Sequence, residues 1–264
     1  MAKVLTAKLG QYDIGRLILG GNPICGTSHF SRAKNMWLRR LLTYDKIVEL
    51  FEKCAEEGIN TFLARGDDHI FKALREYEKR GQRMNWIAQT APERGPYAPE
   101  RHPLNTPASI REIAEHKPIA IYVQGAIVDQ VTNFKERRIG HIEEWLDLIR
   151  DYGLLAGIGT HNHQVVDISE ERGYDPDFYM VTLNPLGYAC SRDVDAISRS
   201  ILSTSKPVLA FKVLGAGRIP PEEAFKFALS HIKNSDFIVV GMVFPEEVEE
   251  NAGLIAKLTK EGQL

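Results

Sequence analysis

Eight short apolar runs recur along this chain, and each is followed by a polar exit and then by a stretch with helical spacing. Steady alternation of this kind is typical of a closed barrel of parallel strands in which a helix follows every strand. We therefore predict one domain over residues 1–264, a single (β/α)8 TIM barrel, because its length is close to the roughly 250 residues of that fold. Functional side chains should then lie at the C-terminal ends of the strands.

The expected strands are short and rich in β-branched or aromatic residues, which favours strand over helix. They are expected at residues 17–19, 61–64, 86–89, 119–123, 155–158, 179–182, 208–211 and 237–240. A small N-terminal β-hairpin, from Val4 to Leu9 with its turn near Gly10, is expected before them and should close the bottom of the barrel. The last two strands end in glycine-rich exits, a pattern typical of phosphate sites in such barrels.

Three further features concern the connections. A helix is expected from about Tyr44 to Glu57, with Cys54 on its buried face and Gly58 as its stop. Thr106 is expected to cap a helix that has proline at its first position. The longer connections at 24–42 and 92–105 are expected to be loops over the mouth of the barrel, because long loops in compact domains are usually functional.

The charge composition limits the classes of binding partner that we expect. The 33 basic and 35 acidic side chains are nearly balanced and form no long block of one sign, which argues against nucleic-acid binding and against membrane association. A small-molecule substrate is therefore expected. The cysteines, only Cys25, Cys54 and Cys190, and the absence of an apolar leader or of a run of roughly 20 apolar residues favour a reduced, cytoplasmic protein.

The first polar cluster follows the second barrel strand and contains Arg65, Asp67, Asp68 and His69. Carboxylates and an imidazole in this position could hold a metal ion or act as acid and base. The alternative is structural: one aspartate caps the next helix at Ile70, and Arg65 pairs with a neighbouring carboxylate.

A second cluster, at residues 159–163, places His161 and His163 on the same side of an extended segment. They could share a metal or an anion, although a divalent metal is the less favoured interpretation because the spacing fixes no third ligand. In the alternative, one histidine contacts substrate and the other faces solvent. Lys212, at the exit of the seventh strand, could form a Schiff base or hold an anionic group, and the glycine-rich turn behind it favours the anion.

Seven residues follow directly on apolar runs and are therefore expected together at the top rim of the barrel. They are Arg65, Gln89, Gln124, His161, Asn184, Lys212 and Gly241.

Several segments together resemble the aldo-keto reductase superfamily of nicotinamide-dependent barrels. The resemblance rests on residues 9–23, 54–62, 159–162, 214–217, 238–242 and 249–251. It implies that Asn162 holds the nicotinamide carboxamide, that Gly215 and Gly217 belong to the loop over the pyrophosphate, and that Glu250 and Asn251 bind the adenine edge.

The chain departs from that family at its catalytic tetrad. Leu63 and Asp68 stand where the family's aspartate and tyrosine are expected, and Gln89-Thr90 and Gln124-Gly125 replace its lysine and histidine. Glu247 stands where NADP-selective members have an arginine, and a carboxylate there would repel a 2′-phosphate. NAD is therefore the cofactor to expect if one is bound.

Three functional hypotheses follow. The first is an enzyme that acts on a small polar or anionic substrate by acid-base chemistry, with Asp68 and His161 sharing the proton transfers and Arg65 and Lys212 binding the anionic end. The second is an atypical NAD(P)-dependent oxidoreductase. The third is a non-catalytic ligand-binding or scaffold barrel.

Overall fold

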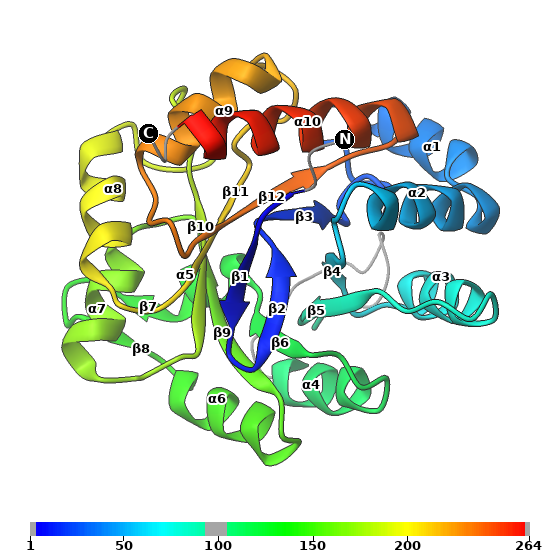
Figure 1. Cartoon of the computed structure of the whole chain (residues 1–264). Coiled ribbons are helices and arrows are strands. Elements are labelled where there is room, and N and C mark those ends of the chain that lie inside the picture. The colour runs from blue at the N-terminus through cyan, green and yellow to red at the C-terminus, as the bar shows by residue number, and fades with distance from the viewer. Residues whose placement is uncertain (1–3, 93–104, 262–264) are drawn as a thin grey trace.

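The computed structural model describes residues 4–92 and 105–261. Its centre is a closed barrel of parallel strands in the order β10-β11-β12-β3-β4-β5-β6-β9 (Figure 1). This confirms the predicted (β/α)8 architecture. The barrel strands are β3 (Leu17–Gly20), β4 (Thr61–Arg65), β5 (Asn85–Gln89), β6 (Ala120–Val123), β9 (Leu155–Thr160), β10 (Phe178–Thr182), β11 (Val208–Phe211) and β12 (Phe237–Gly241).

Helices surround the barrel and connect its strands (Figure 1). They are α1 (Arg32–Leu41), α2 (Tyr44–Glu56), α3 (Asp68–Glu78), α4 (Thr106–Ala114), α5 (Gly125–Val131), α6 (Ile142–Asp151), α7 (Gln164–Arg172), α8 (Val194–Ser203), α9 (Pro221–Ser230) and α10 (Pro245–Glu261). The expected helix near Tyr44 is present, and Cys54 on it is fully buried.

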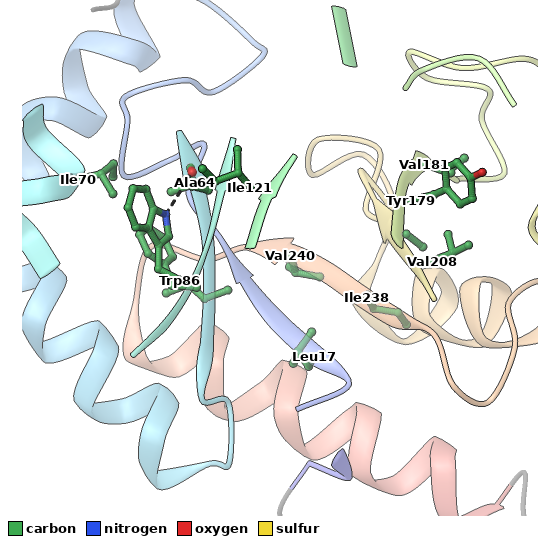
Figure 2. Close-up of a cluster of buried hydrophobic side chains, with 14 of the residues drawn as sticks. Leu17, Ala64, Ile70, Trp86, Ile121, Tyr179, Val181, Val208, Ile238 and Val240 are labelled. Atoms are coloured by element: carbon green, nitrogen blue, oxygen red, sulfur yellow. Dashed lines mark hydrogen bonds between the residues drawn. The ribbon is translucent and has the colours of Figure 1, made fainter. Parts of the chain in front are cut away.

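Alternation along the strands divides the core into two layers. In β12, for example, Ile238 and Val240 pack outward against the helices, whereas Phe237 and Val239 point into the barrel. Successive strand residues face opposite sides of a sheet, so a barrel buries both sets. Figure 2 shows part of the outer layer, where the Trp86 indole donates a hydrogen bond of 3.3 Å to the carbonyl of Ala64.

The N-terminal hairpin consists of β1 (Thr6–Leu9) and β2 (Tyr12–Gly15), paired antiparallel around the positive-φ Gly10. Leu9 and Ile14 are fully buried and belong to the inner cluster of the barrel. The end of the hairpin is tightly packed. A side chain at Gly15 would have no space, because its Cβ would lie 2.8 Å from the carbonyl oxygen of Gly58. The hairpin therefore packs against the barrel interior, on the side away from the strand exits.

Two connections differ from the sequence prediction. Residues 24–42 are not a loop throughout, because they contain α1, in which Leu38 is the one buried residue. The connection between β6 and β9 also contains α5 and a small hairpin of β7 (Thr132–Asn133) and β8 (Arg138–Ile139) that was not predicted. The other expected loop, 92–105, falls mostly on residues 93–104, outside the described part of the chain.

The start of α4 also differs by one residue. The N-cap is Asn105, and Thr106 is the first helical residue, with its hydroxyl buried and lacking a hydrogen-bond partner among the described residues. Pro107 remains in the first turn, where its missing N–H removes no helical hydrogen bond.

Candidate functional site

A cavity of about 510 Å³ opens at the C-terminal ends of the barrel strands. Six of the seven residues expected at the rim line it, namely Arg65, Gln89, Gln124, His161, Lys212 and Gly241. Asn184 does not line it. Its side chain is fully buried and hydrogen-bonds both the backbone N–H and the carbonyl of Tyr188, so it shapes the loop after β10.

The floor of the cavity is apolar and its rim is polar. Leu63, Met180, Phe211 and Val239 reach it from the inner cluster of the barrel. The polar rim residues come from consecutive strand exits, since β4, β5, β6 and β9 are neighbours in the barrel. Arg65, Gln89, Gln124 and His161 therefore form one continuous arc.

The imidazole of His161 is held by Asp129, a residue of α5. The Nδ1 atom of His161 lies 2.8 Å from Oδ2 of Asp129, and the backbone N–H of His161 donates to the same oxygen at 3.1 Å. The hydroxyl of Thr160 donates to the other carboxylate oxygen at 2.6 Å. The two side chains are 34% and 25% exposed.

This contact fixes the tautomer of His161. A carboxylate can only accept hydrogen bonds, so Nδ1 of the ring must carry a proton toward Asp129. In the neutral ring, Nε2 is then left with a lone pair. The ring meets Phe211 edge-on with centroids 5.5 Å apart, and the residue lines the cavity. The arrangement is that of a general base oriented by a carboxylate.

Sequence reasoning did not single out Asp129. It lies within the apolar segment of α5, Ala126 to Val131, which contains no cluster of polar residues. One signal could have identified Asp129: it is the one carboxylate in an apolar segment. A carboxylate on an apolar helix face requires a partner when it is partly buried.

Asp68, the other residue expected to share acid-base work, lies elsewhere. It is exposed in the first turn of α3 and does not line the cavity. Its carboxylate acts electrostatically on His116, which stacks on Phe71. The structure thus does not bring Asp68 together with His161.

Asp67 has the structural role given as the alternative for the cluster after the second barrel strand, that of a helix cap paired with Arg65. Its side chain accepts the Ile70 N–H at 3.2 Å and caps α3, and it lies 3.5 Å from Nε of Arg65. His69 packs on Tyr44, with ring centroids 5.1 Å apart, and burial lowers its pKa. Of this cluster, only Arg65 lines the cavity.

Lys212 lines the cavity at the exit of β11 and is held at its head group. Its Nζ lies 3.1 Å from Nε2 of His29, and Nδ2 of Asn22 lies 3.1 Å from the same nitrogen. The ammonium group of Lys212 can only donate, so Nε2 of His29 accepts from it. Lys212 also has a φ of +59°, a left-handed conformation uncommon for a side-chain-bearing residue.

Formal charge at the cavity is positive. Lys34, Arg65 and Lys212 are its cationic lining residues, and Glu247 is the one carboxylate among the lining residues of the described chain. An anionic ligand is therefore favoured over a cationic one.

Only one of the five residues that the family resemblance connects with a cofactor lines the cavity. Gly217 lines the cavity, whereas Gly215, Asn162, Glu250 and Asn251 do not. Asn162 uses its side-chain oxygen to accept the N–H of Gln164 at the start of α7, and Glu250 is exposed. Asn251 is 3% exposed, and its Oδ1 has no hydrogen-bond partner among the described residues.

Glu247 occupies the start of α10. Its Oε2 accepts the backbone N–H groups of Val243 at 2.6 Å and of Phe244 at 3.3 Å. Phe244 directly precedes α10, so its N–H is a donor at the helix N-terminus, where phosphate binds in other proteins, and Val243 is the residue before it. The chain's own carboxylate fills that position.

Two kinds of feature are absent from the described residues. No group of three or more histidine, cysteine, aspartate or glutamate side chains is placed to hold a metal ion. No described helix has both the length and the apolar character needed to cross a membrane. His163, the second histidine of its cluster, precedes α7 and does not line the cavity.

Comparison with solved structures gives a consistent fold. A Pseudomonas aeruginosa protein described as an aldo-keto reductase aligns with a TM-score of 0.69 at 17% identity, covering 97% of this chain and 96% of that one. The glycerol dehydrogenase AKR11B4 from Gluconobacter oxydans gives 0.61 at 11%, covering 95% and 94%. The chain therefore has a (β/α)8 fold similar to that of these proteins.

Barrels of other activities align as well. A truncated 3-deoxy-D-arabino-heptulosonate 7-phosphate synthase from Thermotoga maritima gives a TM-score of 0.58 at 13% identity, covering 99% of this chain and 93% of that one. No family model and no curated protein matches the sequence. At these identities the likeness concerns the fold, so function must be argued from the cavity.

Proposed function

We propose that this protein is an enzyme that binds a small anionic substrate in the barrel cavity and moves a proton on it with His161. The observation that carries the proposal is the Asp129–His161 pair beside a cavity with excess positive charge. Asp129 replaces Asp68 as the partner of His161 in this proposal.

In this proposal each group of residues has its own role. Nε2 of His161 takes the proton, Asp129 stabilises the imidazolium that forms, and the ring returns the proton in a later step. Lys212 and Arg65 orient the anionic end of the substrate, and the apolar floor excludes water below it. A positioned general base of this type contributes roughly 10²–10⁴-fold to a rate.

Solvent-proton exchange tests the proposal without knowledge of the full reaction. The protein is incubated in D2O with small carboxylates and phosphates that carry a carbonyl group, and loss of the C–H signal next to that carbonyl is followed by proton NMR. Exchange with at least one compound is expected. His161→Gln and Asp129→Asn should each slow it by on the order of a hundredfold or more.

Asp68→Asn is the comparison variant, because the structure leaves that carboxylate exposed and outside the cavity lining. It is expected to exchange at the wild-type rate. Wild-type rates in both His161→Gln and Asp129→Asn, or a loss only in Asp68→Asn, would refute the assignment. Tight ligand binding without exchange or turnover would instead support the non-catalytic alternative.

An atypical nicotinamide oxidoreductase remains a second candidate, supported by two observations. Gly217 lines the cavity with φ +80°, and Asn251 presents a buried acceptor without a partner among the described residues. These residues would hold the dinucleotide, and the cofactor, when bound, would supply hydride chemistry. Glu247 does not fit a 2′-phosphate, which favours NAD.

A further inference from the structure

Two glutamines stand at neighbouring strand exits in the wall of the cavity. Gln89 ends β5 and Gln124 follows β6, and both line the cavity. The Asp129–His161 pair does not involve them. His161 follows β9, the next strand along, and Gly125 backs onto its ring: a Cβ at Gly125 would lie 3.2 Å from Cε1 of His161. Gln124 therefore stands beside the proposed base, and Gln89 lies one strand further along the barrel.

Gln124 is 5% exposed, yet its Oε1 has no hydrogen-bond partner among the described residues. It occupies the N-cap position of α5, but its side chain makes no capping hydrogen bond. Its backbone N–H is already bound to the hydroxyl of Thr90 at 3.0 Å. A buried acceptor without a partner costs free energy, so neither the helix nor the core accounts for this side chain.

Gln89 offers a hydrogen-bond donor where Gln124 offers an acceptor. Its Oε1 accepts the hydroxyl of Tyr122 at 2.8 Å, and Tyr122 is buried. Burial raises the pKa of Tyr122, so its phenol keeps the proton and remains a donor. Gln89 lines the cavity, and with its oxygen bound to Tyr122 its NH2 group is the part of the amide that we assign to a ligand.

From this pair we infer that the substrate carries a hydroxyl group bound between the two amides, donating to Oε1 of Gln124 and accepting from Nε2 of Gln89. A hydroxyl is both donor and acceptor, which matches the two polarities. This inference rests on the proposed function. It narrows the ligand to hydroxylated small anions, such as hydroxy acids or sugar phosphates, and makes the two glutamines specificity-determining residues.

Stability without ligand is the first test. Gln124→Met keeps the length of the side chain and removes the unsatisfied acceptor, so its Tm should rise by about 2–4 °C. Gln89→Met is the matched variant from the next strand. It leaves the buried hydroxyl of Tyr122 without its acceptor, and its Tm should fall by a similar amount. Equal losses in both variants would show that Gln124 is paired in the folded protein and would overturn the inference.

Ligand pairs provide the second test. Affinities are measured by calorimetry for glycerol 3-phosphate against propyl phosphate and for gluconate against hexanoate. The hydroxylated member of at least one pair should bind about tenfold or more tightly, because a site built for a hydroxyl rejects the analogue that lacks it. Gln124→Met should reduce that ratio to about one. Equal affinities within both pairs, or no binding of any member at millimolar concentration, would contradict the inference.

His161→Gln separates this inference from the proposed function. It disables only the proposed base, so the affinity ratio between pair members should survive in it. If the wild type shows the affinity ratio but exchanges no substrate proton, the assignment of the two glutamines stands and the proposed catalysis by His161 is wrong.

Discussion

Replacing Asp129 by asparagine is expected to reverse the tautomer of His161. The carboxylate accepts from Nδ1 of His161 at 2.8 Å, from its backbone N–H at 3.1 Å and from the hydroxyl of Thr160 at 2.6 Å. The oxygen of an asparagine can keep the contact with Thr160. The NH2 group then faces Nδ1, which must become an acceptor, and the ring proton moves to Nε2. A protonated Nε2 cannot serve as a base.

The magnitude follows from the contacts that are lost. The charge-assisted hydrogen bond to Nδ1 is replaced by a neutral one, and the backbone N–H of His161 loses its 3.1 Å acceptor and keeps only the other oxygen, at 3.3 Å. A hydrogen bond to a charged group contributes about 1.5–3 kcal/mol. Because both side chains are a quarter to a third exposed, solvent screens part of this, and we expect the free energy of unfolding to fall by about 1–2 kcal/mol. The effect on proton transfer is larger, roughly 10²–10⁴-fold, since the wrong tautomer disables the base.

Long-range nitrogen–proton NMR correlation spectra distinguish the tautomers directly. The wild type should show Nδ1 protonated and Nε2 bare in the neutral ring of His161, and Asp129→Asn should show the reverse. Urea unfolding of the same samples gives the stability difference, with Asp68→Asn as the control on an exposed carboxylate. An unchanged tautomer together with unchanged stability in Asp129→Asn would refute the role assigned to this pair.

Three further predictions concern other parts of the chain. By calorimetry the wild type should bind NAD more tightly than NADP, and Glu247→Gln should narrow the difference; tighter binding of NADP by the wild type would contradict this. Burial lowers the pKa values of His69 and His116 below the ordinary 6.5. The unfolded chain therefore binds more protons below that value, and stability should fall between about pH 7 and pH 5. Urea unfolding at each pH should show that the free energy of unfolding falls less steeply after His69→Gln and His116→Gln. An unchanged dependence on pH in both variants would contradict this prediction. Gly66→Ala should cost about 1–3 kcal/mol in urea unfolding, because its Cβ would lie 2.1 Å from Cγ1 of Ile113; wild-type stability would show that Ile113 yields freely.

The barrel was predictable because its strands alternate between two apolar layers. Both faces of strands such as β12 are buried, so the apolar runs stand out from the polar exits around them. Helix α1 lacked such a signal. Leu38 is its one buried residue, and the segment carries Arg32, Lys34, Arg39 and Arg40 without a carboxylate, so it was predicted as a polar loop.

The candidate site was predictable in position but not in pairing. Strand exits correctly located His161, Arg65 and Lys212 around one cavity. The partner of His161 was not predicted correctly, because Asp129 lies 32 residues away on a helix that the sequence did not indicate. Asp68 was expected instead. Its neighbour Asp67 is the N-cap of α3, which places Asp68 on the exposed first turn.

The packing of the hairpin β1–β2 under the barrel has a consequence for the order of events at the site. Leu9 and Ile14 fill the barrel interior on the side away from the strand exits, so among the described residues the cavity is open toward the strand exits alone. Two ligands bound together in a cavity with one opening cannot pass each other. Whichever lies deeper must enter first and leave last, so a two-substrate reaction here should follow an ordered kinetic scheme, with the deeper ligand released in the final step.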